Sequence, residues 1–467
     1  MEALQGEAVG FGMEHFGKAQ LGDRRRTRRL VQTADRMMTR PGGTLPDKLQ
    51  DPAELKGLYR LVDAEAVTHA AVLEPHRQLT SKRMRACEGD VLIVHDTTEL
   101  DYTTRESLKG LGQIGNGSRR GYLCHNSLAV VAASREVLGL ANQILHCRAI
   151  VPEGETRAER REREDRESRL WKRGSEAIGP APSGRRWIDV CDRGGDLFEY
   201  LAFKHTSGGF YVVRSKHDRR VEVDEETAQR REQLHAYARN LPSLGEKTVE
   251  VPARDGRAGR TARVRIAAGR VTVPPPKNPR GEHGTAPLTL WVVYAGEIDP
   301  PAGVEPVEWI LLTDVPTEGL AQTQERITWY SCRWIVEEYH KGQKTGCGIE
   351  LPQFTTKERL EPVIVLLSVV AVYLLQLRSS SRRADAQTRR ADEIMPKQHV
   401  AVLSAWRFGE IRSDLSVYDF YHALARLGGH QNRKHDHPPG WIVLWRGWMK
   451  LQDMVAGAAA MEKVRCG

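Results

Sequence analysis

The stretch WYSCRWIVEEYHKGQKTGCG, residues 329–348, constrains this chain more than any other segment does. At about 100° per residue, Arg333, Glu337 and Lys344 fall within about 60° of Tyr330 on a helical wheel. A carboxylate surrounded by cationic side chains suits a metal ligand that works beside phosphates, because the cations bind the phosphate anion. The simpler alternative is an exposed helix with an ordinary i,i+4 pair between Arg333 and Glu337.

The charge balance favours a polyanionic partner. The 467 residues carry 70 Lys and Arg against 61 Asp and Glu, a net charge of +9, which suits either nucleic acid or an acidic membrane surface. The seven scattered cysteines form no CxxC pair, so neither a disulfide framework nor a zinc ribbon is indicated, and a reducing, cytoplasmic location is expected. The longest apolar run, 363–377, is too short to span a membrane and indicates a buried helix.

Hydrophobic periodicity divides the chain into three parts, and the fold class expected is α/β. Residues 1–80 are patterned as helices, residues 81–378 mainly as strands with a mostly β insertion at about 218–305, and residues 379–467 as helices again. Strands are predicted at 91–94, 127–133, 137–145, 187–191, 210–213, 248–251, 262–267, 271–273, 288–294 and 309–313. A mixed-charge, exposed helix is predicted at 153–173.

Two helical segments suggest contacts with other molecules. In residues 19–40, Asp23 is the expected N-cap. Arginines crowd the positive end of that helix, so DNA phosphate is one candidate partner and a solvated basic face is the alternative; they are Arg24, Arg25, Arg26, Arg28 and Arg29. Near the C-terminus an apolar stripe indicates either a buried helix or a helix that binds a partner or a second copy. The stripe consists of Trp441, Leu444, Trp445, Trp448, Leu451 and Val455.

Three carboxylates are placed in the sequence where they could form one shared site. Asp96 and Asp192 each follow a predicted strand, and Glu337 lies on the helix that follows a further strand. Carboxylates displayed at a sheet edge and on an adjoining helix can hold two Mg²⁺ ions through hard oxygen ligands. Such a site activates water or a 3′-hydroxyl and stabilises the oxygen that leaves a phosphodiester.

Several segments, in order and approximate spacing, resemble bacterial DDE transposases of the insertion-sequence-four family, in the branch containing the transposase of transposon five. They are LGDRRRTRRLV, HDTTELDY, CDRGGDLFEYL, VVRSKH, EWILLTDVP, YSCRWIVEEYHKGQKTGCGIE and VVAVYLLQLR. Together they span nearly the whole chain, and the tyrosine, arginine, glutamate and lysine of the opening stretch match the family's signature. Gly342 departs from the pattern, where a bulkier residue is usual, and so does the proline-rich joint at 274–276.

The resemblance implies an RNase H-like catalytic core with its β insertion between the second aspartate and the glutamate. It implies cut-and-paste DNA transposition with a hairpin at the transposon end, and a homodimer paired through the C-terminal helices in a synaptic complex. Its partners would be transposon-end inverted-repeat DNA and target DNA, without a membrane. It implies two Mg²⁺ ions, with Mn²⁺ able to substitute, on Asp96, Asp192 and Glu337.

The same resemblance assigns DNA contacts. Tyr330, Arg333 and Lys344 would grip phosphates beside a flipped base, and Trp309 would stack on that base; a core tryptophan is the alternative for Trp309. Contacts with end DNA would come from Arg214, Lys216 and the five N-terminal arginines. Two rival functions remain: a nuclease on the same core that cuts without joining, and a non-catalytic DNA-binding descendant. The presence of all three acidic residues argues against the second.

Overall fold

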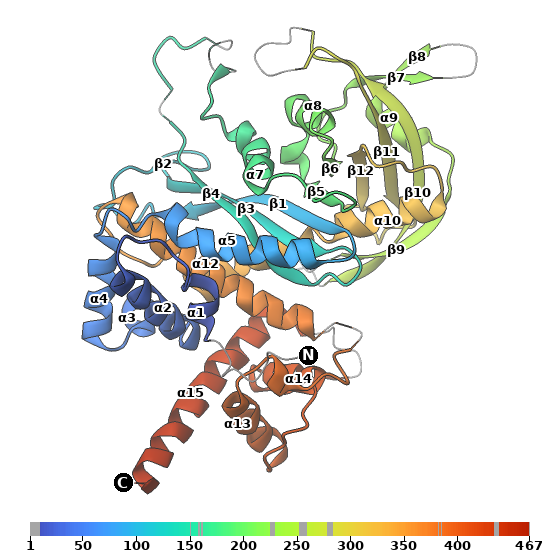
Figure 1. The fold of residues 1–467 in the computed structure, drawn as a ribbon. Helices are drawn as coiled ribbons and strands as arrows, with labels where there is room; N and C mark the ends of the chain where they lie inside the picture. The colour runs from blue at the N-terminus through green and yellow to red at the C-terminus, as the bar shows by residue number, and fades with distance from the viewer. Residues whose placement is uncertain are drawn as a thin grey trace.

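The computed structural model describes residues 10–466, with gaps at 150, 157–158, 160–161, 225–228, 252–258, 278–283, 382, 384 and 434–438. A helical N-terminal part, a large mixed sheet and a helical C-terminal part follow one another along the chain (Figure 1). The fold is therefore mixed α/β, as the change from helical to strand periodicity predicts.

Helices build the described N-terminal part: α1 (Phe11–Phe16), α2 (Arg24–Thr39), α3 (Leu45–Lys48), α4 (Pro52–Val62) and α5 (His69–Ala86). α2 begins where the sequence predicts, because the Asp23 carboxylate accepts a hydrogen bond of 2.8 Å from the backbone N–H of Arg25. Its thin apolar stripe, Leu30, Ala34 and Met37, is fully buried. The stripe therefore fixes which face of α2 packs inward and leaves the arginine-rich face outward.

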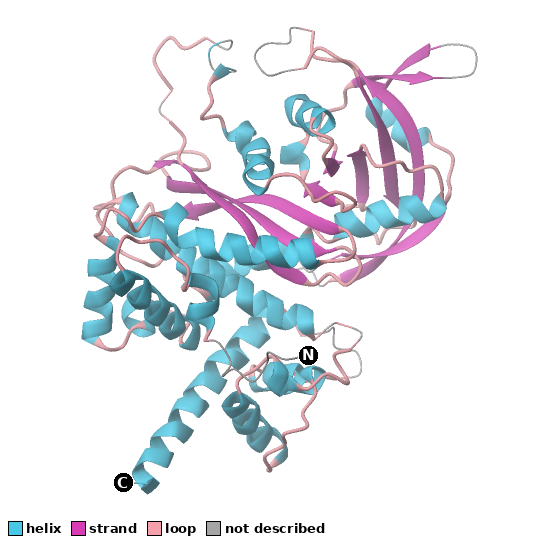
Figure 2. Ribbon diagram, viewed as in Figure 1, coloured by secondary structure: helices cyan, strands magenta, loops and turns pink. Residues whose placement is uncertain are grey.

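The first half of the sheet surrounds β1 (Val91–Asp101) (Figure 2). β1 is antiparallel to β3 (Arg120–Val131), which carries β2 (Gly112–Gln113) and β4 (Val137–His146), and parallel to β5 (Trp187–Cys191), which is parallel to β6 (Phe210–Arg214). The strand predicted at 91–94 continues to Asp101, because its polar second half still pairs with β3 after β5 has ended. Asp96 thus lies inside β1, and the expectation that it ends the strand is wrong.

The insertion extends this same sheet. Its elements are β7 (Arg220–Asp224), β8 (Gln229–Gln233), α9 (Leu234–Asn240), β9 (Gly245–Val251), β10 (Arg260–Val273) and β11 (Leu288–Glu297), followed by β12 (Glu308–Thr313). The strand order continues from β6 through β12, β11, β10, β7 and β8. The strands predicted at 262–267 and 271–273 are one strand, β10. Residues 225–228, 252–258 and 278–283 of the predicted insertion lie outside the described residues.

Helices cover both faces of the sheet. α7 (Leu170–Ile178) and α8 (Phe198–Thr206) lie on one face, and α5 and α12 (Lys357–Ser380) on the other (Figure 1). Residues 157–158 and 160–161 of the helix predicted at 153–173 lie outside the described residues; of the rest, residues 153–156 and 163–166 are not helical, and a 3₁₀ turn, Glu167–Arg169, leads into α7. α7 begins where Leu170 and Trp171 give an apolar face to bury, and helices owe most of their stability to such a face.

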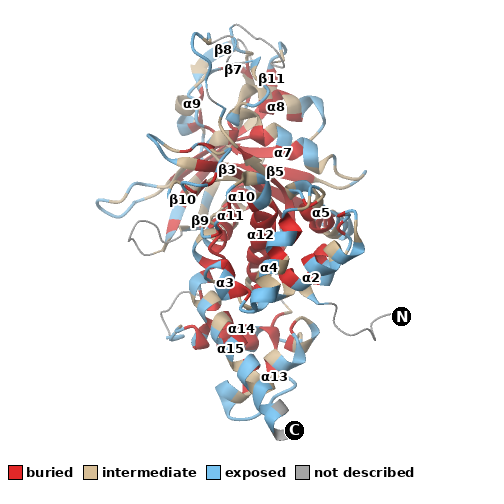
Figure 3. Ribbon diagram, turned by 90° about the vertical axis from the view of Figure 1, so that its left-hand side faces the viewer, coloured by how far each residue is buried: buried red, intermediate tan, exposed pale blue. Residues whose placement is uncertain are grey.

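α12 is the centre of the core, as the buried residues around it show (Figure 3). Its length and composition would let it cross a membrane, yet 83% of its most apolar window is buried inside the protein. The prediction of a buried helix at 363–377 is confirmed. α12 contacts α2, α4, α5, β4 and the C-terminal helices, so it joins all three parts of the chain.

The C-terminal part contains α13 (Lys397–Phe408), α14 (Val417–Leu427) and α15 (Trp441–Cys466). Most of the α15 stripe is buried within this chain, with Trp445 partly so, which confirms the buried-helix alternative. Trp441 lies against the π-helical turn Gly342–Gly346, where a Cβ added at Gly346 would come within 2.0 Å of its indole ring. A glycine is therefore required there by close packing.

We expect Gly346→Ala to lower the free energy of unfolding by about 1–3 kcal/mol, because the added methyl group overpacks the site against a rigid ring. Urea unfolding followed by tryptophan fluorescence measures this change. The matched control is Gly457→Ala in α15, where nothing lies within 4 Å of the added carbon. This control should leave stability unchanged or raise it by up to about 1 kcal/mol. Equal effects of the two substitutions would contradict the packing argument.

Candidate functional site

The sheet brings the two predicted aspartates to neighbouring strand positions. His95 of β1 pairs with Cys191 of β5 in parallel register, so Asp96 and Asp192 are the next residues on adjacent strands. Asp192 then caps a short 3₁₀ turn, where its carboxylate accepts a hydrogen bond of 2.8 Å from the N–H of Gly194. Parallel pairing thus delivers two carboxylates to one edge, as the sequence predicts.

The carboxyl of Asp96 has a raised pKa. Burial raises the pKa of its carboxyl to about 7, and the charges of Asp192 and Glu337 add to that rise. The Arg333 guanidinium and the N–H of Thr97 act in the opposite direction. Asp192 and Glu337 therefore both lie near enough to Asp96 to act on its carboxyl, although the three residues come from β1, the end of β5 and α11 (Trp334–Lys341).

One guanidinium lies between two of these carboxylates. Nη1 of Arg333 is 3.7 Å from Asp96 Oδ2, and Nη2 donates to Glu337 Oε1 at 2.8 Å. Burial acts to lower the pKa of Arg333, but the neighbouring Tyr330, Glu337 and Asp96 outweigh it and keep the pKa above its ordinary value. Arg333 is thus a buried, permanently charged counter-ion, and the i,i+4 pair considered from sequence is only half of its contacts.

The opening stretch is not one regular helix. α10 (Leu320–Ser331) ends before Arg333, α11 begins at Trp334, and residues 342–346 form a π-helical turn. The expectation of continuous helical geometry is therefore wrong, and residue 342 is where α-helical bonding changes. The spatial grouping still holds for Tyr330, whose ring lies 6.0 Å from the guanidinium carbon of Arg333. Glu338 is turned away from these residues, in an ion pair with Arg378 of α12.

The side chains of Trp309 and Tyr330 pack against each other. Their rings meet edge to face at 5.0 Å, and their exposed fractions are 4% and 2%. In this conformation Trp309 matches the core-tryptophan alternative, since its faces are covered. Burial raises the pKa of Tyr330, against the charges of Arg333 and Arg214, so Arg214 also lies beside the site.

The remaining predicted contacts are more peripheral. Arg214 donates from Nη2 to the carbonyl of Glu308 at 2.8 Å. Lys216 has an exposed side chain, and its backbone N–H donates to Asp196 at 2.6 Å. Lys344 lies on the π-helical turn, with Nζ 3.7 Å from Glu350 Oε1. The helical wheel had set Lys344 on the same helix as Glu337, whereas the structure has it on the turn that follows α11.

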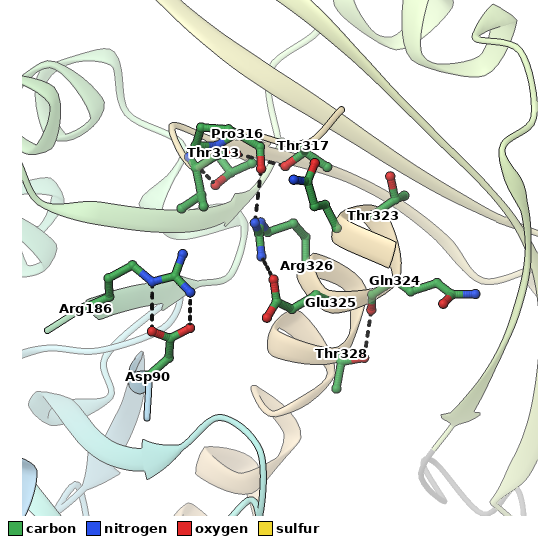
Figure 4. Close-up of polar contacts among 12 residues, drawn as sticks. Asp90, Arg186, Thr313, Pro316, Thr317, Thr323, Gln324, Glu325, Arg326 and Thr328 are labelled. Atoms are coloured by element: carbon green, nitrogen blue, oxygen red, sulfur yellow. Dashed lines mark hydrogen bonds and ion pairs between the residues drawn. The ribbon is translucent and has the colours of Figure 1, made fainter. Parts of the chain in front are cut away.

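α10, which carries Tyr330, is anchored by its own arginine. Arg326 is buried, donates to the carbonyl of Pro316 at 3.1 Å and pairs with Glu325 (Figure 4). Its guanidinium carbon lies 4.1 Å from the centre of the Trp329 ring, and that of Arg186 lies 5.6 Å from the same ring. Cation–π contacts of this kind fix the end of α10 against β5.

Sequence reasoning missed a buried acidic residue next to the site. Asp189, in the middle of β5, accepts hydrogen bonds from Tyr200 at 2.7 Å and Ser175, and its Oδ2 is 2.9 Å from Lys204 Nζ. Burial alone would raise the pKa of Asp189, but Lys204 and His95 hold it below its usual range. The alternation of a strand is the available signal: Asp189 faces α7 and α8, so it supports the sheet from behind.

The donor set suits a hard cation, because carboxylate oxygens are the ligands that Mg²⁺ and Mn²⁺ prefer. In the described parts of the chain, no three His, Cys, Asp or Glu side chains are grouped closely enough to hold a metal ion as they stand. Arg333 instead supplies the positive charge between Asp96 and Glu337. Burial is the main cause of the raised pKa of Asp96, and the negative charges of Asp192 and Glu337 add to it, so further positive charge there would favour the ionised carboxylate.

The N-terminal residues match a known family. Residues 10–67, which include α1 to α4, match the family model described as transposase DNA-binding. This match supports a transposase. The five predicted arginines lie inside the matched region, and Arg24, Arg25, Arg28 and Arg29 are exposed. Arg26 is partly buried, and its Nη1 donates to the carbonyl of Leu21 at 3.0 Å.

The raised pKa of Asp96 predicts a stability difference that depends on pH. The carboxyl is protonated in both states below its ordinary pKa of 3.8, and only the unfolded state ionises as the pH rises toward about 7. The wild type should therefore lose stability across that window relative to Asp96→Asn. The variant should be the more stable by up to about 4 kcal/mol at pH 8, and nearly equal to wild type at pH 4.

Urea unfolding in EDTA at the two pH values measures this difference. Asp299→Asn is the control, because Asp299 is an exposed carboxylate whose side chain is 87% accessible. A difference between Asp96→Asn and wild type that does not change with pH would refute the electrostatic description of the site.

Proposed function

We propose that this chain is a DDE transposase that moves DNA by a cut-and-paste mechanism. The observation that carries the proposal is that Asp96 lies within electrostatic reach of both Asp192 and Glu337, which come from separate elements, and shares the Arg333 guanidinium with Glu337. The transposase DNA-binding match over residues 10–67 supports DNA as the partner. The resemblance to the insertion-sequence-four family supplies the finer mechanism.

The catalytic core in this proposal is RNase H-like. Three antiparallel strands, β4, β3 and β1, are followed by two parallel neighbours, β5 and β6, which is the strand arrangement expected of such a core. The β insertion lies between Asp192 and Glu337 in sequence, as the resemblance implies. We propose 81–378 as the catalytic domain, between a DNA-binding domain at 1–80 and a dimerisation domain at 379–467.

The three carboxylates would hold two Mg²⁺ ions, for which Mn²⁺ can substitute. When bound, the ions lower the pKa of the attacking water or 3′-hydroxyl and stabilise the oxygen that leaves. The protein residues orient the DNA strand. Arg333, which pairs with Glu337, and Lys344, on the turn that follows α11, would bind the phosphates beside the cut, with Tyr330 next to Arg333. The Trp309 indole would stack on a flipped base once DNA draws Tyr330 and its neighbours apart.

The reaction proceeds by successive in-line displacements at phosphorus. Water first cleaves one strand at each transposon end and leaves a free 3′-hydroxyl. That hydroxyl attacks the opposite strand, which closes a hairpin and releases the flanking DNA. A second water opens the hairpin, and the regenerated 3′-hydroxyl joins to target DNA. Each step uses the same geometry, so one active site serves all four.

The partners proposed are transposon-end inverted-repeat DNA, target DNA and a second copy of the chain in a synaptic complex, within the cytoplasm. Arg214, Lys216 and the N-terminal arginines would contact end DNA. Incubation of the protein and Mg²⁺ with the DNA that flanks its coding sequence tests the proposal. Hairpin products on a denaturing gel are expected. Cleavage without joining of pre-cut ends would favour the rival nuclease, and binding without cleavage would favour the non-catalytic rival.

Neighbouring glutamates provide a matched test of the site. Glu337→Gln should slow end cleavage at least about 100-fold, because a metal–carboxylate centre supplies several kcal/mol of transition-state stabilisation. Glu338→Gln should cleave nearly as fast as wild type, since Glu338 faces Arg378 instead. Both variants should bind end DNA as wild type does in a gel-shift assay. Similar cleavage by the two variants would overturn the assignment of Glu337.

The exposed N-terminal arginines should determine how binding depends on salt. Replacing Arg24, Arg25 and Arg28 together by alanine should weaken DNA binding. The slope of log K against log salt should fall by about 0.9 for each DNA phosphate that the variant no longer neutralises. Fluorescence anisotropy at several salt concentrations measures the slope. Arg263→Ala is the control, because Arg263 is also an exposed arginine but lies in β10; an equal change in slope there would contradict a specific role for α2.

A further inference from the structure

A buried hydrogen bond connects the strand behind Asp96 to the helix that carries Glu337. Asn126 of β3 and His340 of α11 are 3.1 Å apart, between Nδ2 of the amide and Nε2 of the imidazole. Both side chains are at least nine-tenths buried. Burial, with the nearby charges of Lys344 and Arg333, lowers the pKa of His340 to about 3. The imidazole is therefore neutral, and Nε2 can accept the amide N–H.

The positions of these two residues give the bond its significance. Asn126 is directly opposite Asp96 in the antiparallel register of β1 and β3, so the two side chains leave the sheet on the same face. His340 follows Glu337 by three residues on α11, which sets them on neighbouring positions of one helical surface. A single hydrogen bond thus joins Asn126, the cross-strand partner of Asp96, to His340, the helical neighbour of Glu337.

Further buried polar side chains form hydrogen bonds with Asn126 and with the helices around it, and so support the bond between Asn126 and His340. The amide of Gln143 on β4 donates to Asn126 Oδ1 at 2.8 Å and to Ser368 Oγ of α12 at 2.9 Å. Gln343, on the π-helical turn, donates to the same Ser368 oxygen at 2.9 Å and to the Tyr339 hydroxyl at 3.1 Å. Buried groups of this kind are costly to leave unpaired, so the network favours one arrangement of α11 on the sheet.

We infer that Asn126 and His340 are positioning residues: their hydrogen bond sets how far the Glu337 carboxylate stands from Asp96, and so how tightly the site binds a divalent cation. Neither side chain touches the cation or the DNA in this assignment. They act through the backbone of β3 and α11. The inference rests on the proposed function, because it concerns the same three carboxylates.

The test compares full-length His340→Ala, His340→Gln and Asn126→Ala with wild type. Mn²⁺ is the probe, and binding is followed by the decrease of the free-ion electron paramagnetic resonance signal. His340→Ala and Asn126→Ala should weaken Mn²⁺ binding by about 10-fold or more, as removal of a group that orients a metal ligand does in other metal sites. His340→Gln should restore most of the affinity, because its side-chain oxygen can accept from the same amide.

The matched control is His399→Ala. His399 is a partly buried histidine that is also bonded to an amide, that of Gln452 at 2.9 Å, but the pair joins α13 to α15. Its removal should lower the melting temperature to a similar extent and leave Mn²⁺ affinity unchanged. The Mg²⁺ concentration that half-saturates nicking of supercoiled plasmid should rise for His340→Ala and not for His399→Ala.

Two failures are distinguishable. If wild type binds Mn²⁺ and nicks DNA, but folded His340→Ala binds Mn²⁺ as tightly as His399→Ala does, the positioning role is overturned and the proposed function stands. A decrease of affinity in His340→Gln equal to that in His340→Ala also overturns it. If wild type neither binds Mn²⁺ nor nicks DNA with Mg²⁺, the proposed function itself fails, and the inference falls with it.

Discussion

The burial of the Asp96 carboxyl beside other acidic groups, at the junction of β1, β5 and α11, is the constraint on which the rest of the structure depends. Asp192 and Glu337 add their negative charges to the effect of burial, and Arg333 pairs with Asp96 and Glu337 at once. Bringing like charges together inside a protein costs free energy. The surrounding sheet and helices must therefore be stable enough to hold an arrangement that its own charges oppose. Sites that store such strain are commonly functional.

The sheet supplies that stability from both faces. On one face, Asp189 is held by Lys204, Tyr200 and Ser175, and this paired network fixes β5 to α7 and α8. On the other face, the buried helix α12 packs against β4 and α5 and carries the serine that joins the amide network. Removing one member of either network would leave buried polar groups without partners, which costs more than the bond itself contributes. The two networks thus hold β1, β5 and α11 in fixed positions relative to one another.

The strands and the buried helices could be predicted from the sequence because a buried apolar run leaves a clear pattern. The strands at 187–191 and 210–213 and the helix at 363–377 were predicted in this way. Errors arose where tertiary contacts determine the local conformation. β1 continues past its apolar run because β3 pairs with its polar residues, and in the range 153–173 the helix α7 begins only where Leu170 and Trp171 are buried. Pairing partners and helix supports of this kind do not appear in local periodicity.

The opening stretch shows the same limit at the site itself. Spacing grouped Tyr330, Arg333 and Glu337 correctly, because residues three and four apart remain neighbours even across the break between α10 and α11. Spacing failed for Lys344, because the conformation there is set by a residue far later in the chain. Trp441, at the start of α15, fits against Gly342 and Gly346, and the turn between these glycines is π-helical. A bulkier residue at 342 would meet that indole at 3.1 Å.

Close packing against Trp441 therefore accounts for a glycine at 342, the position at which the sequence departs from the pattern that it resembles. Through this contact the C-terminal part reaches the π-helical turn that carries Lys344. Any change that shifts α15 relative to α12 must also shift this turn, since both contact it. The π-helical turn, α12 and α15 therefore form one packed unit, which couples the C-terminal helices to the end of α11, the helix that carries Glu337.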